Sequence, residues 1–272
     1  MAEESKQGYT LELSEPERMR YRMMAGLARE NEADLWEYAG IIPGARVADV
    51  GCGPGAVLTE IAQIVGPEGT AVGVEPGQQA REAAREELDS HGFEHVEVRD
   101  GNGEETGLEP GDWDCVVMRH VLTHTGDAAP RIVAHLATLL APGGHLYLVD
   151  VDLETSRSSP HDPQLDEQYA RYADFHRSLG NDPRLGTQLG AMLRTAGLEV
   201  AEHRGVFQRI PAMLVADGGP LASAQDAMIA AGIISAEEAV AWRAARQRFA
   251  ALPDAEAWFA TFVAIGRKPD GE

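Results

Sequence analysis

Hydrophobic residues along the chain form two kinds of pattern. Short apolar runs indicate buried strands, whereas apolar positions that recur every three or four residues indicate helices. Val57, Leu58, Ile61 and Ile64 follow the helical spacing directly after the first apolar run. The runs predict seven strands, at residues 47–50, 71–74, 96–98, 112–118, 145–150, 198–210 and 257–265. Because short strands mostly alternate with helices, we expect a doubly wound α/β fold.

A turn rich in glycine joins the first predicted strand to the first of these helices. Its sequence, residues 51–55, is Gly-Cys-Gly-Pro-Gly. Glycines at 51, 53 and 55 let the backbone turn sharply and bring its N–H groups close to a ligand, and Pro54 suits the first turn of a helix. Since Gly51-x-Gly53-x-x-Ala56 also fits the dinucleotide fingerprint, the turn alone leaves the nucleotide open.

Acidic residues follow the next two predicted strands. Glu75, with Pro76 after it, stands 24 positions beyond Gly51, where a carboxylate can accept hydrogen bonds from both hydroxyls of a ribose. Asp100 and Gly101 end the third strand, where a carboxylate suits the exocyclic amine of adenine and a backbone N–H suits a ring nitrogen. These positions predict a site for an adenosine-containing cofactor.

Five motifs in register resemble the class I S-adenosylmethionine-dependent methyltransferases, and the chain looks most like their small-molecule branch in quinone and natural-product pathways. The motifs occupy, in family order, Asp49–Gly55, Glu75, Asp100, Trp113–Val117 and Leu140–Gly144. The resemblance covers roughly residues 40–200. It implies a Rossmann-like seven-stranded sheet with helical cap insertions, S-adenosylmethionine as the cofactor, and a role in secondary metabolism such as antibiotic biosynthesis.

The resemblance also implies a division of the chain and of the site. Residues 1–40 would form an N-terminal helical arm, and residues 41–272 the methyltransferase domain, with cap insertions at about 153–185 and 211–252. The first insertion would open with a polar loop. The cofactor-binding residues would be Asp49, Gly51, Gly53, Gly55, Glu75, Pro76, Asp100, Gly101 and Arg119, the last paired with the methionine carboxylate.

Two predicted N-caps mark helices in the arm and in the second insertion. Ser14 with Glu17, and Ser235 with Glu238, have the spacing of capping boxes. The second insertion reads as two or three helices, broken at 217–220 and at Gly232. Such a helical segment suits a lid or the surface of a homodimer.

Candidate catalytic residues follow the fourth and fifth strands. Members of the resembled family often use a histidine after strand four, oriented by a carboxylate after strand five, which His124 and Asp150 match best. His120 is the second choice, and its spacing from His124 would place both on one face of a helical turn. Packing or capping of that turn by the histidines is an equal alternative. No metal site is predicted, because the paired acidic ligands of catechol-type members are missing.

Charge and cysteine content restrict the substrate classes and the cellular compartment that we expect. The chain holds 23 basic and 44 acidic residues, a net charge of −21, which repels nucleic-acid backbones. Met118–Val121 stands where amino-methylating relatives carry an Asn/Asp-Pro-Pro-Tyr box, so a small-molecule acceptor is expected. Cys52 and Cys115 give no reason to expect a disulfide. Without an apolar leader in residues 1–8 or a run of about 20 apolar residues, we expect a cytoplasmic protein that does not cross a membrane.

The sequence therefore predicts an enzyme that transfers a methyl group from S-adenosylmethionine to oxygen or nitrogen of a small organic acceptor. A cyclase or another non-methylating enzyme on the same fold is the first alternative. An NAD-dependent dehydrogenase and a non-enzymatic binding module are the others, since fold alone does not determine function.

Overall fold

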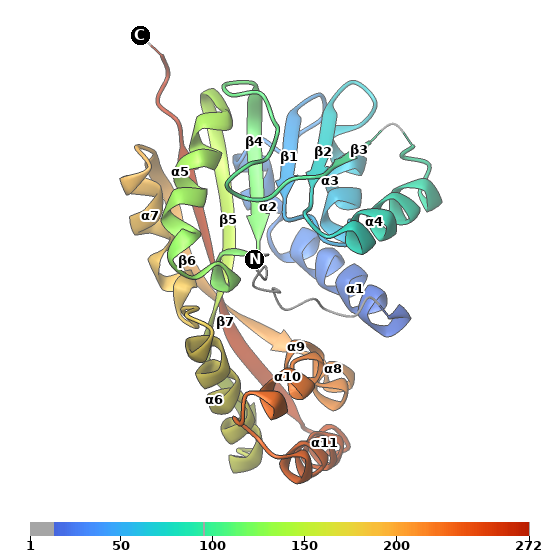
Figure 1. Cartoon of the computed structure of the whole chain (residues 1–272). Helices are drawn as coiled ribbons and strands as arrows, with labels where there is room; N and C mark the ends of the chain where they lie inside the picture. Colours follow the sequence, from blue (N-terminus) through green and yellow to red (C-terminus); the bar gives the residue numbers. More distant parts are fainter. Residues whose placement is uncertain (1–13, 95, 272) are drawn as a thin grey trace, which may run out of the picture.

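Seven strands form one mixed sheet in the computed structural model, which describes residues 14–94 and 96–271 (Figure 1). Along the sheet their order is β3-β2-β1-β4-β5-β7-β6, and β7 alone runs opposite to the direction of the other strands. This confirms the predicted strand count and fold class. The strands are β1 (Arg46–Val50), β2 (Thr70–Val74), β3 (Glu97–Arg99), β4 (Trp113–Arg119), β5 (Leu140–Ser159), β6 (Glu199–Ile210) and β7 (Glu256–Arg267).

Helices cover both faces of the sheet because successive strand residues point to opposite sides. Val47 joins a buried cluster with Trp36 and Leu58, whereas its neighbour Ala48 joins a second cluster with Leu136. The first cluster lies under α1 (Glu15–Asn31), α2 (Ala33–Tyr38), α3 (Ala56–Val65) and α4 (Gln78–Ser90); the second lies under α5 (Ala129–Leu139) and α7 (Leu189–Thr195). The sheet is therefore doubly wound.

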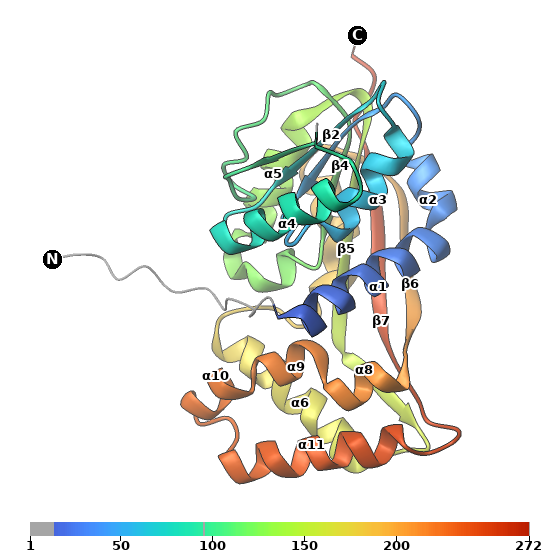
Figure 2. The same cartoon turned by 90° about the vertical axis from the view of Figure 1, so that its right-hand side faces the viewer.

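A second group of helices lies at one end of the long strands (Figures 1 and 2). We call this group the cap: α6 (Pro163–Ser178), α8 (Ala212–Asp217), α9 (Gly219–Ser223), α10 (Gln225–Ala230) and α11 (Ala236–Ala250). It has hydrophobic clusters of its own, the larger built around Tyr172, Met228 and Trp242. Figure 2 shows α1 lying between the cap and the helices α3 and α4.

The first insertion begins later than the sequence predicts. Residues 153–159 continue β5, and Arg157 and Ser158 pair with Trp258 and Ala257 of β7. The stretch resembles a loop in sequence because its buried positions are serines: Ser156 and Ser158 are 4% and 9% exposed. Their hydroxyls satisfy local backbone groups, so burial costs little. Alternating burial, rather than apolar character, marks this strand.

Helix caps follow the sequence at one predicted position and depart from it at the other. Ser235 and Glu238 form the predicted capping box at the start of α11. At the start of α1, Ser14 makes no side-chain cap, and the Glu17 carboxylate accepts hydrogen bonds from Arg20 and from Ser223 of the cap. The described part of the predicted helical arm forms two helices with a break at residue 32, and residues 1–13 lie outside the described part.

The second insertion contains more helices than predicted. Breaks occur near Gly218 and Gly232, as expected, but α9 and α10 are also separate helices. Three short 3-10 helices complete the described elements: η1 (Leu122–His124), η2 (Gly126–Ala128) and η3 (Leu185–Gln188). Among the helices of residues 14–94 and 96–271, none has the length and apolar character that a membrane span requires.

Candidate active site

The three glycines of the turn between β1 and α3 have different structural roles. All three have positive φ, at +79° for Gly51, +53° for Gly53 and +82° for Gly55. A Cβ at Gly51 would lie 2.5 Å from Val121, and one at Gly55 would lie 2.9 Å from Ala84. A Cβ at Gly53 would meet nothing within 4 Å. Close packing therefore requires Gly51 and Gly55, while Gly53 keeps an open side where a ligand can approach the backbone.

Glu75 holds this turn from the end of β2. One of its carboxylate oxygens accepts a hydrogen bond from the Gly53 N–H at 3.1 Å, and the other accepts from the Gly77 N–H at 2.9 Å. A carboxylate has about four acceptor positions, so these two bonds leave capacity for the hydroxyls of a ribose. The residue is thus in the predicted place and is oriented by backbone groups.

The loops after β2 and β3 are joined by Arg81, which the sequence analysis missed. Its guanidinium donates to the carbonyls of Glu75 and Pro76 and to Asp100, the last at 2.8 Å. The Asp100 side chain remains 76% exposed. The backbone at Gly101 is tightly enclosed, since a Cβ there would lie 2.9 Å from the Glu105 carbonyl. The two acidic strand ends therefore lie side by side, as predicted, with Asp100 open to solvent.

Asp49 brings an unsatisfied acceptor to the same edge of the sheet. It is 3% exposed, and its Oδ2 has no hydrogen-bond partner within the described residues. Burial raises the pKa of this carboxyl to about 7, although Arg119 acts in the opposite direction. An ammonium group placed against Oδ2 would supply the missing partner and favour the ionised form. The amino group of a methionine moiety meets that requirement, so the residues fit the implied cofactor.

Arg119 is engaged differently from the sequence prediction. Its guanidinium donates two hydrogen bonds to Glu32 of the arm, at 2.6 and 3.1 Å. Glu32 also accepts from the Tyr147 hydroxyl at 2.5 Å and from the Trp36 indole at 3.4 Å. Burial tends to raise the pKa of Glu32, but the attraction of Arg119 and these hydrogen bonds outweigh it, so the pKa is lowered. In this structure Arg119 thus ties the arm to the end of β4.

Asp150 acts on the backbone rather than on a histidine ring. Its carboxylate accepts from the N–H of Thr123 and from the N–H of Val151, each at 2.9 Å. Burial raises its pKa to about 6, against the opposing effect of these bonds. Because Thr123 precedes His124 in η1, Asp150 fixes the short turn that carries the histidine. Within the described residues, no hydrogen bond joins Asp150 to the His124 ring.

The two histidines after β4 do not share a helical turn, which corrects the sequence prediction. His120 has φ of +56°, outside the helical region, and η1 begins only at Leu122. Burial, with Arg119 nearby, lowers the pKa of His120 to about 3, and its buried Nδ1 has no partner in the described part of the chain.

His124 instead meets a histidine from the cap. Its ring centroid lies 5.1 Å from that of His176 on α6, which Tyr172 contacts edge-on at 4.7 Å. The His124 side chain is exposed, and desolvation by its neighbours lowers its pKa. No spacing rule could have joined these rings, because they come from segments that meet only in the folded protein.

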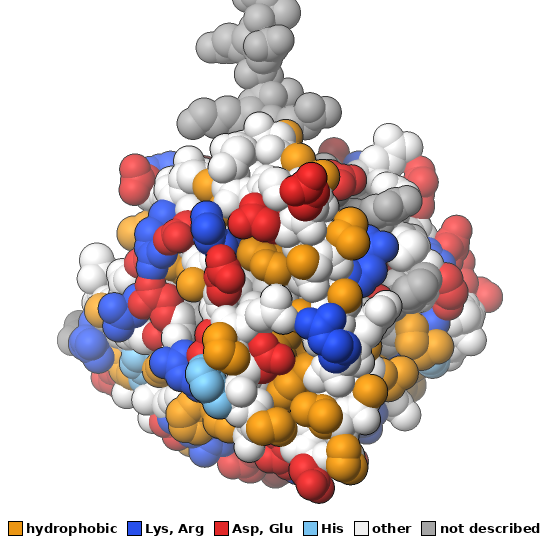
Figure 3. Space-filling view, turned by 90° about the horizontal axis from the view of Figure 1, so that it is seen from below, with side chains coloured by type: hydrophobic (Ala, Val, Ile, Leu, Met, Phe, Trp, Pro, Cys, Tyr) orange, Lys and Arg blue, Asp and Glu red, His pale blue; other side chains and the backbone are white. Residues whose placement is uncertain are grey.

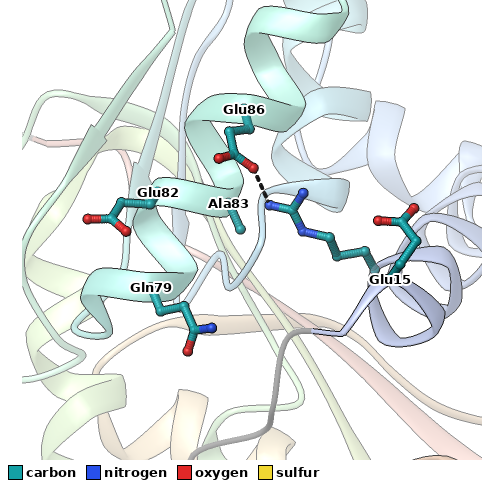
Figure 4. Close-up of a pocket in the computed structure, with 6 residues that line it drawn as sticks. Glu15, Gln79, Glu82, Ala83 and Glu86 are labelled. Atoms are coloured by element: carbon teal, nitrogen blue, oxygen red, sulfur yellow. Dashed lines mark hydrogen bonds and ion pairs between the residues drawn. The ribbon is translucent and has the colours of Figure 1, made fainter.

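A hollow of about 250 Å³ lies elsewhere, between the arm and α4 (Figure 4). Figure 4 shows Glu86 on α4 and Glu15 on the arm on either side of a guanidinium, that of Arg18, which is bonded to Glu86 at 2.7 Å. Nearby, Arg22 of the arm binds the buried Glu87. These ion pairs attach α1 to the domain. The hollow has no part in the glycine turn or the histidine pair.

The sheet order, the glycine turn and the acidic strand ends define a Rossmann-like methyltransferase fold. Comparison with known proteins identifies the family: a profile described as a methyltransferase domain matches residues 17–203. The chain belongs to this methyltransferase-domain family. This confirms the family resemblance predicted from the five motifs.

Two relatives bear O-methyltransferase names. The nocamycin O-methyltransferase of Saccharothrix syringae is 37% identical over 106 residues, which cover 39% of this chain and 38% of that protein. The ubiquinone biosynthesis O-methyltransferase of Xanthomonas campestris pv. campestris is 32% identical over 167 residues, covering 61% and 67%. The chain spans only about half the length of several curated relatives that it matches, namely 44%, 38% and 55%.

Solved structures agree on the fold. A Bacillus halodurans protein assigned to the methyltransferases matches with a TM-score of 0.59 and 19% identity, covering 88% of this chain and 99% of that one. The [4+2]-cyclase SpnF matches with a TM-score of 0.55 and 19% identity, covering 92% and 82%. At such identities the likeness concerns architecture alone.

Proposed function

We propose that this protein is an S-adenosylmethionine-dependent methyltransferase that acts on the hydroxyl of a small organic acceptor. One set of observations carries the proposal: the turn is open at Gly53, its N–H donates to the carboxylate of Glu75, and the buried Asp49 at the end of β1 has an oxygen without a partner among the described residues. An adenosyl sulfonium carries a ribose and an ammonium group that match these two acceptors. Membership of the methyltransferase-domain family supports the same cofactor.

The residues of the chain hold the reactants rather than activate the donor. When bound, S-adenosylmethionine supplies a methyl group on a positively charged sulfur, which is already an activated donor. Glu75 would accept hydrogen bonds from the ribose hydroxyls, Asp49 would accept one from the ammonium group, and Asp100 with Gly101 would bind the adenine. Arg119 can pair with the methionine carboxylate only in exchange for part of its bonding to Glu32. Orientation and exclusion of water are the main contributions left to such a site.

His124 is the general base that removes the proton from the acceptor. A neutral imidazole is a competent general base near pH 7, and burial keeps this ring neutral by lowering its pKa. Asp150 is a positioning residue, because it acts through the η1 backbone. The His120 ring is a weaker candidate, since burial lowers its pKa to about 3.

A small acceptor suits the surface better than a nucleic acid. The net charge of −21 disfavours phosphate backbones. Figure 3 shows a face on which acidic, basic and hydrophobic side chains are interspersed, without a continuous basic area. The names of these two relatives favour oxygen as the methylated atom and a secondary metabolite or quinone as the acceptor class. We place the enzyme in the cytoplasm.

A cyclase that binds the same cofactor without consuming it is a second candidate. The match to the [4+2]-cyclase over 92% of this chain is the observation in its favour. A product heavier by 14 Da than the acceptor, with one equivalent of S-adenosylhomocysteine, identifies methyl transfer. An isomerised acceptor of unchanged mass identifies the cyclase.

Cofactor binding is tested by a matched pair of glycine substitutions. Gly53 and Gly92 both have positive φ, and a Cβ at either meets nothing within 4 Å, so alanine strains both backbones in the same way. We expect calorimetry to show that Gly53→Ala weakens S-adenosylhomocysteine binding about tenfold or more, because the methyl group occupies the ligand's side of the turn. Gly92→Ala, at the far end of α4, should bind like wild type. Absence of binding by the wild-type protein would refute the proposal.

A further inference from the structure

A group of buried charged side chains lies under the arm, on one face of the three central strands. Asp49 of β1 and Tyr147 of β5 are each paired in register with Val117 of β4, the strand between them. Paired residues of neighbouring strands share a face, and so do alternate residues of one strand. Asp49, Arg119 and Tyr147 therefore lie together on the face that α1 to α4 cover. Glu32 reaches them from the break between α1 and α2.

Glu32 binds the guanidinium of Arg119 through both carboxylate oxygens. Nη1 donates to Oε2 at 2.6 Å, and Nη2 donates to Oε1 at 3.1 Å. The two side chains are only 13% and 10% exposed. The Tyr147 hydroxyl and the Trp36 indole also donate to Oε2, so Glu32 is held in place independently of Arg119. Bidentate pairing of this kind is how an arginine recognises the carboxylate of a ligand.

Asp49 lacks a partner of this kind. Its Oδ2 is buried and accepts no hydrogen bond from a described residue. The amino acid end of S-adenosylmethionine, or of its product S-adenosylhomocysteine, brings one ammonium and one carboxylate. The ammonium supplies what Asp49 lacks, but the carboxylate meets a guanidinium that Glu32 already occupies. Two carboxylates on one buried guanidinium would leave a negative charge without a partner, which is costly, so they compete.

We propose that Glu32 occupies, on Arg119, the place of the ligand's carboxylate and is displaced by it when the cofactor binds. This inference rests on the proposed methyltransferase function and assigns to its cofactor site an internal competitor. Because Glu32 acts through Arg119, it is a positioning residue. It lowers the affinity for ligands that carry an amino acid end and leaves the affinity for ligands without one unchanged. The bonds of Glu32 to Tyr147 and Trp36 can persist after its displacement.

Displacement of Glu32 also affects the arm, because the arm breaks at this residue. The Glu32 N–H donates to the Ala28 carbonyl at the end of α1, and its own carbonyl accepts from the Trp36 N–H in α2. Loss of the bonds to Arg119 removes two of the contacts that hold this break against β4. Amides around the break should then open more readily.

Calorimetry with two ligands tests the displacement on the full-length protein. S-adenosylhomocysteine carries the amino acid end, whereas methylthioadenosine has the same adenosine and thioether sulfur without it. We expect Glu32→Gln to bind S-adenosylhomocysteine about tenfold more tightly than wild type, because a neutral amide of the same shape competes less for the guanidinium. Its affinity for methylthioadenosine should stay unchanged. Glu60→Gln is the matched control: it breaks the ion pair with Arg29 of the same arm and should alter neither affinity.

Hydrogen exchange of the wild-type protein gives a second measurement that needs no variant. Saturation with S-adenosylhomocysteine should speed the exchange of amides 32–36 relative to saturation with methylthioadenosine. A merely structural role of Glu32 would change both affinities alike. Weaker or unchanged binding of S-adenosylhomocysteine by Glu32→Gln, or equal exchange of these amides with the two ligands, would overturn the displacement. Failure of the wild type to bind either ligand would instead refute the proposed function.

Discussion

The two sides of the candidate site differ in how fully their polar groups are satisfied. At the carboxyl edge of the sheet, Glu75 and Asp150 are bonded to backbone N–H groups, and Asp100 is paired with Arg81. At the boundary with the cap, the rings of His124 and His176 hydrogen-bond no described residue. At the sheet edge, Asp49 keeps one buried oxygen without a partner among the described residues. The edge otherwise fixes its geometry through local backbone bonds, whereas the cap side keeps donors and acceptors available for an acceptor molecule.

The same division appears in the packing. The sheet is enclosed by two large hydrophobic clusters that contain fully buried residues such as Leu58 and Leu148. The cap has two smaller clusters and a buried Arg246 whose guanidinium binds Gln168 rather than an acid. Fewer apolar contacts and a less fully satisfied interior favour local opening. We therefore expect the cap to be the less stable part, joined to the sheet by long strands and by the arm.

Breaking the ion pair between Glu32 of the arm and Arg119 at the end of β4 should have the largest effect on stability. Glu32→Ala leaves Arg119 buried without its acid, and we expect unfolding by denaturant to show a loss of about 3–5 kcal/mol. The pKa of Glu32 is lowered in the folded protein, so its contribution is present above the unfolded value of about 4.5 and is lost as the pH falls further. Glu30→Ala, an exposed neighbour on α1, is the control. A loss below about 1 kcal/mol would show that this pair does not anchor the arm.

The fold and the sheet side of the site could be predicted because their determinants are consecutive residues. A strand, a glycine turn and an acid at the next strand end leave their marks within about 30 positions of sequence. Arg119 and Glu32 are separated by 87 residues, and nothing at either position indicates the other. His124 and His176 likewise meet only through tertiary packing. The end of β5 was missed because buried serines conceal its alternation.

Substitution of the buried Asp49 at the edge of the sheet should have an intermediate effect on stability, and this effect should depend on pH. The pKa of Asp49 is raised to about 7 in the folded protein. Its contribution to folding stability is therefore fully present below the ordinary pKa of an aspartate, and it is lost as the pH rises through 7. Asp49→Asn stays neutral, and we expect the free variant to exceed wild type by about 2–4 kcal/mol at pH 8 and to match it near pH 4. Thermal unfolding at both pH values measures the difference.

Binding of S-adenosylhomocysteine should reverse the stability advantage of Asp49→Asn over wild type. With saturating S-adenosylhomocysteine at pH 8, the Asn variant loses the partner of the ammonium group and should gain less stability from the ligand than wild type. Asp254→Asn, at an exposed position, controls for the change in net charge. A stability gap that is the same at pH 4 and pH 8 would refute the assignment of the raised pKa to Asp49.

Loss of one hydrogen bond between the cap and the arm should have the smallest effect on stability. It compares the local stability of the cap with that of the sheet most directly. The Ser223 hydroxyl of α9 donates to Glu17 of the arm at 2.7 Å, and Ser223→Ala removes this bond at a cost of about 0.5–1 kcal/mol. Hydrogen exchange should show faster opening of amides in α9 and α10, with those of β1 and β4 unchanged. Ser178→Ala, whose hydroxyl bonds only within α6, should leave α9 and α10 unaffected. If the Ser223 variant accelerates exchange equally in β1 and β4, the cap and sheet open as one cooperative unit, and the difference in stability between them disappears.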